Sequence, residues 1–193
     1  MDSQYILTGL QLLYADTDTI KNYCRTNKVA RDICNSVDFW LEKFDYDNLP
    51  IIGLNNKTGV DYMKEYIKVT DAQQKAKRIL NIMSNDRSGL KCIYFRLKIN
   101  NPNFLKIFSI DHQNLILEVM EKFNQPTDAA ISINLKINVY DNLFVDITSV
   151  NNHIFSGRKS LSLHITDTFD ALTKIYYYYP YIEIKNCAGM RTL

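Results

Sequence analysis

The sequence predicts an α+β fold in which a small helical module and a bridging helix precede an antiparallel sheet with a few helices on one face. Two observations support this prediction. Apolar residues recur three and four positions apart in segments up to Met83, and from Gly89 onward they tend to alternate with polar residues. The chain has 193 residues, 46% hydrophobic and 23% charged, which is enough for a small module and a larger domain. We therefore predict a helical module at residues 1–50, a linker and bridging helix at 51–88, and a sheet domain at 89–193.

Two short amphipathic helices are predicted within residues 16–44. The side-chain oxygens of Asp16 and Asp18 can cap a helix that begins near Asp18. Asn27 interrupts the apolar pattern, and Ser36 can cap a further helix after the pattern resumes. The apolar positions at helical spacing are Ile20, Tyr23, Cys24, Ile33, Val37, Phe39, Trp40 and Phe44.

These apolar residues first of all predict a hydrophobic core, because large apolar side chains are usually buried. The predicted core residues of the module are Cys24, Ile33, Phe39 and Trp40. The preceding segment, Ile6 to Tyr14, carries apolar residues nearly all round a helix, so it has one face for its own domain and another that is open to a partner. The candidate partner-binding residues are Leu7, Leu10, Leu13, Tyr14 and Ile20.

The run TIKNYCRTNKVARDICNSVDFWLEKF, followed by DNLP, resembles the later part of an F-box. F-boxes are small helical modules that end in a Cys-containing helix, a polar break and an aromatic pair, here Phe39-Trp40. More narrowly, the run is similar to the F-box-like modules that large DNA viruses of protists encode in many copies. The resemblance implies a non-enzymatic adaptor that docks on the Skp-family adaptor of a Skp-cullin-F-box ubiquitin ligase. The C-terminal domain would then bind an unknown target protein.

An alternative is a viral structural or host-interaction protein in which the F-box-like helices are only part of a larger fold. Such a protein would self-associate as a homo-oligomer or bind nucleic acid. The opening of the chain separates the two interpretations. F-boxes usually open with a Leu-Pro pair and an acidic residue, whereas this chain begins MDSQYILTGLQLLYAD and has no proline there. In the alternative, the Ile6 to Tyr14 segment is core or a dimer surface.

The middle of the chain predicts a connection followed by a long helix. Pro50, Gly53 and Gly59 lie in a polar, Asn-rich stretch that is typical of a loop. Helical periodicity returns from Val60 to Met83, with Lys and Arg residues mostly off the apolar stripe, as on a solvated face. This helix is the predicted bridge between the modules.

The clearest strand pattern is the alternation from Ala130 to Tyr140, which predicts one buried and one solvated face. Asp141 and Asn142 predict a two-residue hairpin turn, because both tolerate positive φ. Further strands are predicted at residues 91–99, 143–148, 160–166 and 181–184, with helices at 114–123 and 168–178. The tyrosine-rich end of the last helix, Lys174 to Ile182, predicts a helix end and an edge strand.

Composition argues against several functions. The net charge of +2 and pI near 8.2 do not form a basic surface for nucleic acid or an anionic membrane. The sequence shows no spanning segment and no leader, so we expect an intracellular protein of the host cytoplasm or the virion. We expect the four cysteines to be reduced, with Cys24 and Cys34 in the core.

Chemical motifs are also missing from the sequence. The three histidines are far apart and sit in no metal-ligand spacing, so we predict neither a metal site nor a cofactor. No serine elbow, phosphate loop, dinucleotide fingerprint or His-Glu-x-x-His occurs, and we name no catalytic residue. The sequence therefore predicts a protein that is not an enzyme.

Overall fold

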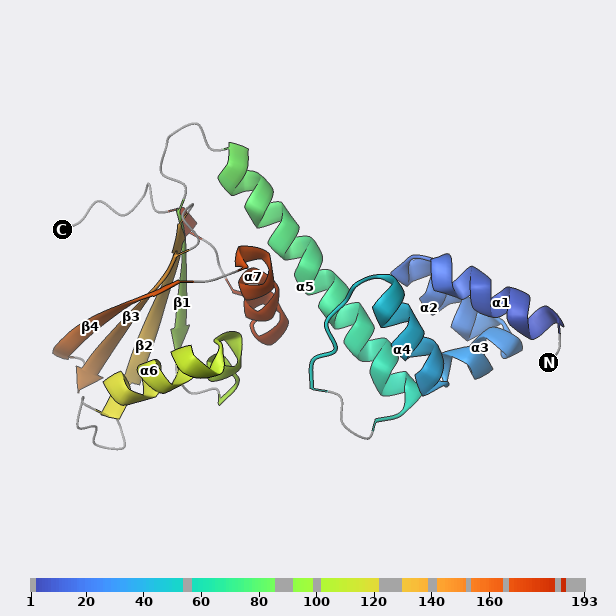
Figure 1. Ribbon diagram of the computed structural model, residues 1–193, viewed down its shortest axis with the longest axis horizontal. Helices are drawn as coiled ribbons and strands as arrows, with labels where there is room; N and C mark the ends of the chain where they lie inside the picture. The colour runs from blue at the N-terminus through green and yellow to red at the C-terminus, as the bar shows by residue number, and fades with distance from the viewer. Residues whose placement is uncertain are drawn as a thin grey trace. The chain divides into compact units, whose positions relative to one another are not determined.

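The computed structural model describes residues 3–53, 57–85, 92–98, 102–121, 130–138, 142–151, 154–164, 167–182 and 185–186 (Figure 1). It divides into an N-terminal unit, Met1–Asp71, and a C-terminal unit, Ala72–Leu193. The division falls inside the long helix α5, Gly59–Asn85, so the first half of this helix groups with the N-terminal helices. The predicted boundary near residue 50 concerns independent folding and stays a prediction.

Four further helices form the rest of the N-terminal unit. They are α1 (Ser3–Tyr14), α2 (Thr17–Thr26), α3 (Lys28–Cys34) and α4 (Val37–Tyr46). The predicted caps are confirmed: Asp16 accepts a hydrogen bond from the Thr19 amide at 2.7 Å, and Ser36 accepts one from the Phe39 amide at 3.4 Å. Asn27 both ends α2 and caps α3, which explains the break in the apolar pattern at this residue.

Two backbone features fix where α4 ends and α5 begins. Asn48 has a φ of 51°, and the Asn48 and Leu49 amides donate to the carbonyls of Asp45 and Phe44, which is the Schellman arrangement that terminates a helix. Gly59 starts α5 against the end of α3, where an added Cβ would lie 2.2 Å from the Asn35 carbonyl oxygen. Only glycine permits this close approach.

The core of the N-terminal unit lies around Trp40, which is fully buried. Its Nε1 donates to the Cys34 carbonyl at 2.7 Å, and its ring lies 5.1 Å from the ring of Phe39 and 5.4 Å from that of Tyr66. The Phe44 ring packs edge-on against Tyr66. All four residues predicted for this core, Cys24, Ile33, Phe39 and Trp40, are buried. The first half of α5 therefore completes the module through Tyr66.

The expectation of reduced cysteines is wrong for Cys24 and Cys34, which form a disulfide between α2 and α3. Helical periodicity placed each cysteine on an apolar face of its own helix. Such periodicity does not show whether the faces of two helices meet. The two cysteines are ten residues apart and lie in different helices, so their contact could not be predicted from it.

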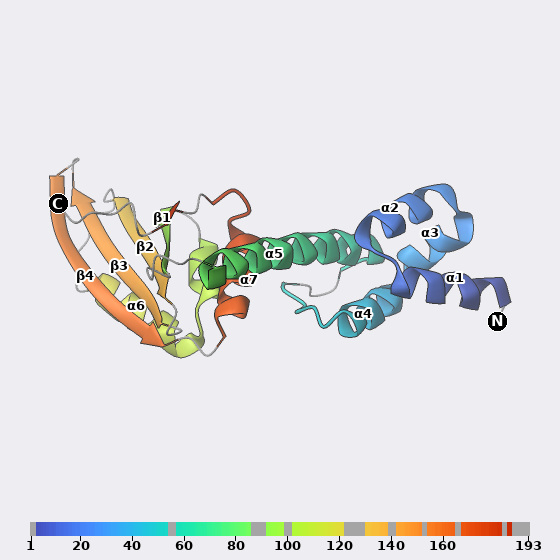
Figure 2. The same cartoon turned by 90° about the horizontal axis from the view of Figure 1, so that it is seen from above.

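The C-terminal unit contains the second half of α5 and all of the strands. Its other elements are β1 (Cys92–Lys98), η1 (Pro102–Ile107), α6 (Ile110–Glu121), β2 (Ala130–Asn138), β3 (Asn142–Asn151), β4 (Ile154–His164), α7 (Thr168–Tyr178) and β5 (Lys185–Asn186). The strands pair antiparallel in the order β4-β3-β2-β1-β5, and Figure 2 shows the four longer ones side by side. Helix α7 packs against η1, and most residues of α7 are buried. Its cap is Asp167, which accepts hydrogen bonds from two amides.

The predicted fold class is wrong. Helices hold 77% of the residues whose backbone and side chains the structure describes. The prediction made an antiparallel sheet the main body of the fold and placed only a few helices on one face of it. The prediction overestimated the share of the sheet in the fold, because strand alternation is easy to recognise in a sequence. It also gave the 27-residue helix α5 only a bridging role. The part of the chain that the structure describes is therefore predominantly helical.

Three smaller predictions from the strand region have different outcomes. The turn at Asp141 and Asn142 lies partly outside the described residues, because the description resumes at Asn142, the first residue of β3. The strand predicted from Tyr181 is wrong at its start, since Tyr181 lies in a turn and β5 begins at Lys185. The end of the strand predicted at 160–166 also lies outside the description, which stops at His164 in β4.

Candidate functional site

The outward face of α1 is apolar. Leu7, Leu10 and Tyr14 are 59%, 47% and 66% exposed, and their spacing of three and four residues places them on one side of the helix. Thr8 and Leu12 are buried on the other side. A helix of a monomeric protein normally turns charged or polar residues outward, so α1 has one more apolar face than its own unit covers.

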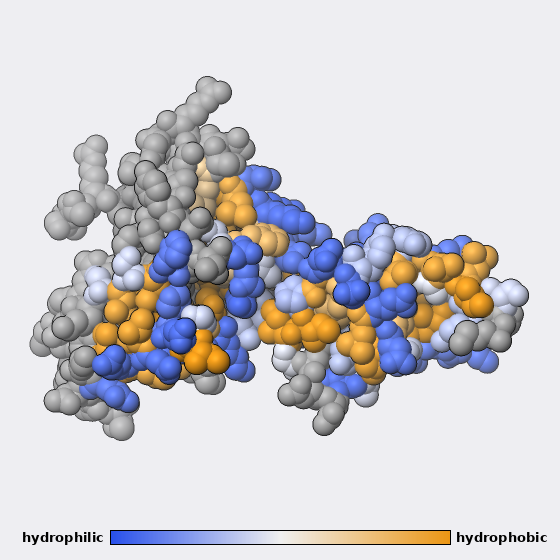
Figure 3. Space-filling model, in the orientation of Figure 1, coloured by the Kyte–Doolittle hydropathy of each residue, from blue (hydrophilic) through white to orange (hydrophobic). Residues whose placement is uncertain are grey.

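Aromatic residues extend this face onto α4. The Tyr14 ring lies 5.1 Å from the Tyr46 ring in an edge-on arrangement, and Tyr46 is itself exposed. Together with Ile6, also exposed, these side chains form what we call the α1 apolar surface: Ile6, Leu7, Leu10, Tyr14 and Tyr46. Figure 3 shows hydrophobic residues gathered over the N-terminal helices. Single exposed apolar residues are common, whereas a contiguous group points to an interaction.

Two of the five residues predicted to bind a partner are buried. Leu13 is 8% exposed and Ile20 is 1% exposed, so both belong to the core of the N-terminal unit and cannot contribute to a surface. The sequence placed them correctly on apolar helical positions. For Leu13 it could not separate the inward from the outward positions of α1, because apolar residues occur on both sides of this helix. Ile20 belongs to α2 and is buried there together with Cys24.

A buried lysine holds the end of α1 in place. Lys43 of α4 is 2% exposed, and its Nζ donates to the Leu13 carbonyl at 2.6 Å and to the Ala15 carbonyl at 3.1 Å. These carbonyls lie at the C-terminal end of α1, where the helix leaves acceptors unpaired and where its dipole favours a cation. The third Nζ contact is Asp47 Oδ2 at 2.9 Å. The three donors of the ammonium group therefore have three acceptors.

Tyr66 of α5 completes this polar cluster. Its hydroxyl donates to Asp47 Oδ2, and the Lys43 ammonium lies 5.6 Å from the centre of its ring. Burial and the hydrogen bond to the Asp47 carboxylate raise the pKa of Tyr66. The cluster ties α1, α4 and α5 together, so the position of the α1 apolar surface depends on groups that lie inside the unit.

The sequence analysis missed Lys43, Asp47, Tyr66 and Tyr46. A lysine between two aromatic residues of an amphipathic helix gives no signal of burial, because lysine is almost always exposed. A weak signal exists for the two tyrosines: Tyr66 lies on the apolar stripe of the predicted long helix, and Tyr46 follows Phe44, an apolar position at helical spacing, by two residues. Asp47 gave no signal.

Neither a metal nor a membrane site emerges from the described residues. They contain no group of three or more His, Cys, Asp or Glu side chains that could hold a metal ion. Among the helices that the structure describes, none is long and apolar enough to cross a membrane. Comparisons with protein-family models, with curated proteins and with solved structures found no match for this chain.

Proposed function

We propose that the protein is a non-enzymatic interaction adaptor whose α1 apolar surface binds a partner protein. The observation that supports this most directly is the exposed row of Leu7, Leu10 and Tyr14 on the face of α1 opposite its buried residues. Anchors at positions i, i+3 and i+7 of one helix are the pattern by which helices dock into a hydrophobic groove. The polar cluster of Lys43, Asp47 and Tyr66 supports the same role, because it holds α1 in a fixed position. A helix that is already fixed loses less conformational entropy when it binds a partner.

The partner that we propose is a Skp-family ubiquitin-ligase adaptor, on the resemblance of residues 19–44 to an F-box. The C-terminal unit would then bind a target protein. Such an adaptor acts inside a host cell, and we place the protein in the host cytoplasm. The proposal involves no reaction on this chain, no cofactor and no bound metal.

A binding measurement tests this proposal. The purified full-length protein is titrated with a eukaryotic Skp-family adaptor in a calorimeter, and micromolar or tighter binding is expected. Leu7→Asp and Leu10→Asp place a charge on the exposed face, so each should abolish binding while the far-ultraviolet circular dichroism stays unchanged. Asn22→Asp is the control, because Asn22 is an exposed polar residue of α2 and does not belong to the α1 apolar surface. Its binding should be close to that of the wild type.

The alternative is a viral structural or host-interaction protein that self-associates through the same surface. The exposed apolar face of α1 favours this candidate equally well, because a second copy could cover it. Sedimentation equilibrium separates the two candidates. A dimer that Leu10→Asp converts to a monomer, together with no binding to the Skp-family adaptor, would replace the ligase proposal by self-association, with the virion as the expected location.

A further inference from the structure

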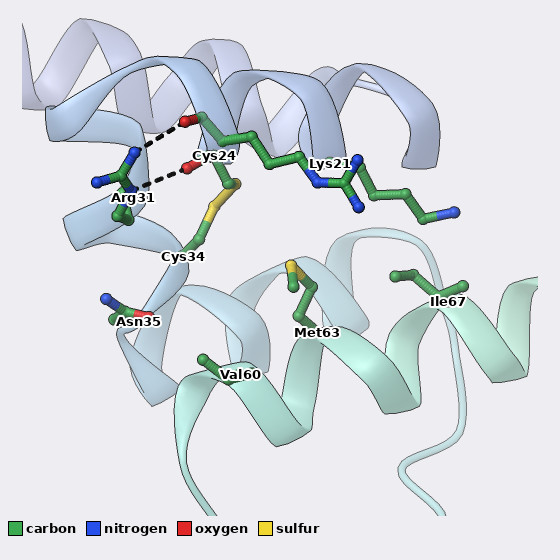
Figure 4. Close-up of a pocket in the computed structure, with 9 residues that line it drawn as sticks. Lys21, Cys24, Arg31, Cys34, Asn35, Val60, Met63 and Ile67 are labelled. Carbon is green, nitrogen blue, oxygen red and sulfur yellow. Dashed lines mark hydrogen bonds between the residues drawn. A yellow bond between two sulfur atoms is a disulfide. The ribbon is translucent and has the colours of Figure 1, made fainter.

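A pocket of about 280 Å³ lies within the N-terminal unit, between α2, α3 and the first turns of α5 (Figure 4). Val60, Met63 and Ile67 line its α5 side and face the Cys24–Cys34 disulfide. The residues that line the pocket are Lys21, Cys24, Arg25, Arg31, Cys34, Asn35, Val60, Met63 and Ile67. None of them belongs to the α1 apolar surface.

The walls of the pocket are held by two fixed contacts. The disulfide joins α2 to α3 on one side, and the close approach of Gly59 to the Asn35 carbonyl places the start of α5 on the other. The apolar side chains of α5 therefore face the bridge across a defined gap. A pre-formed cavity of this kind needs little reorganisation to accept an apolar side chain.

The charge of the pocket has one sign. Of the nine residues that line it, Lys21, Arg25 and Arg31 are cationic and none is acidic. Lys21 has an ion pair with Asp18 at 3.5 Å, but Asp18 is 90% exposed, and such a pair contributes little and is readily exchanged for another anion.

Arg31 is held in place by backbone acceptors. Its Nη2 donates to the Arg25 carbonyl at 2.8 Å, and its Nε donates to the Cys24 carbonyl at 3.4 Å. These two bonds use two of the five donors of Arg31. Both acceptors are neutral carbonyls, so they do not neutralise the charge of the guanidinium. In Figure 4 these bonds turn Arg31 toward the end of α2, on the opposite side of the disulfide from Lys21. Arg31 therefore adds to the positive charge at the edge of the pocket without contacting the ligand group that Lys21 would bind.

We propose that this pocket binds the carboxyl end of a peptide whose last residue is apolar. The apolar side chain would contact Met63 and Ile67, and the terminal carboxylate would pair with Lys21 and Arg25. Charge complementarity requires an anion, and the α5 wall requires an apolar group next to it. A volume of about 280 Å³ suits one large side chain with its carboxylate rather than a longer segment.

Three synthetic peptides test the proposal on the ¹⁵N- and methyl-labelled full-length protein. The first is acetyl-Ala-Ala-Phe with a free carboxylate, the second is its C-terminal amide, and the third is acetyl-Ala-Ala-Gly with a free carboxylate. The first should shift the methyl signals of Met63 and Ile67. The second and third should bind about tenfold more weakly or worse, because each lacks one half of the recognised group.

Two charge variants locate the site. Lys21→Gln combined with Arg25→Gln should weaken binding of the first peptide at least about tenfold, and Arg25→Gln alone should weaken it less. Lys28→Gln removes one positive charge, as Arg25→Gln does, from an exposed position of the same unit that does not line the pocket, so it should leave affinity within about twofold. Leu10→Asp should also have no effect, which separates this proposal from the one for the α1 apolar surface.

Several results would overturn the proposal. They are no binding of the first peptide at millimolar concentration, equal affinity for the acid and its amide, and an equal loss with Lys28→Gln. Shifts confined to residues outside the pocket would count against it in the same way.

Discussion

The two units differ in how their buried donors are paired. In the N-terminal unit the buried side-chain donors of Trp40 and Lys43 have backbone or carboxylate acceptors, although the acceptor Glu65 Oε1 is buried without a hydrogen-bond partner. In the part of the C-terminal unit that the structure describes, two donors, the hydroxyls of Thr173 and Tyr179, are buried without a partner. Burial raises the pKa of Tyr176 on the same helix to about 12. Paired buried groups such as Lys43 fix one helix at one place on another, whereas the residues that α7 buries are mostly apolar.

The largest effect should come from cutting the chain. A fragment of residues 1–50 lacks Tyr66 and Gly59, which complete the core and fix the start of α5, whereas residues 1–85 contain both. We expect cooperative thermal unfolding of the 1–85 fragment and none of the 1–50 fragment, followed by circular dichroism. A cooperative transition in the shorter fragment would instead support a module boundary at residue 50.

Replacing Trp40 by Ala should come next. The change removes a fully buried ring and its hydrogen bond, so we expect the N-terminal unit to lose about 3 to 5 kcal/mol in urea unfolding. Leu41→Ala is the control, because Leu41 is 41% exposed and adjacent in the same helix. Near-wild-type stability of Trp40→Ala would refute the description of this core.

The matching change in the C-terminal unit is Leu172→Ala in α7. Leu172 is fully buried, so a loss of about 2 to 4 kcal/mol is expected in that unit. Signals from Trp40 fluorescence report on the N-terminal unit and should keep their midpoint. A parallel shift of the Trp40 transition would show that the two units unfold together.

Lys43→Met tests the polar cluster directly. It leaves the Leu13 and Ala15 carbonyls and the Asp47 carboxylate without their cation, and we expect a loss of about 2 to 3 kcal/mol. Lys28→Met at an exposed position is the control. A stable Lys43→Met variant that still binds its partner would show that packing alone positions α1.

The smallest effect concerns pH. The pKa of Tyr66 is raised in the folded state, so its contribution to stability is fully present below the ordinary tyrosine value of 10.0 and is lost as the pH rises towards the raised value. Between pH 9 and pH 10.5 the free energy of unfolding of the wild type should fall further than that of Tyr66→Phe, and the difference should be up to about 1 kcal/mol. Equal slopes for the two proteins would contradict the assignment.

Features encoded by adjacent residues could be predicted from the sequence. The caps at Asp16 and Ser36 and the core position of Trp40 follow from spacings of three and four residues, and the structure has them there. Helix α2 begins at Thr17, within one residue of the start predicted near Asp18. These properties depend on the backbone of one helix and need no knowledge of its neighbours.

Features that depend on which helix faces meet could not be predicted. Leu10 and Leu13 look alike in the sequence, yet one is exposed and the other buried. The disulfide and the burial of Lys43 likewise depend on contacts between helices, the latter over 28 to 30 residues. The fold class failed for a different reason: the helices of the second half of the chain were predicted close to where they lie, but the sheet was treated as the main body of the fold.

The seclusion of Lys43 has a practical consequence for chemical labelling. An amine reagent attacks only the uncharged, accessible amine, and this one is enclosed by α1, α4 and α5. Modification at position 43 should therefore require α1 to detach, while exposed lysines such as Lys28 react at once. Mass spectrometry would give the labelling rate at each lysine. The rate at Lys43 would then measure how often α1 detaches from the rest of its unit.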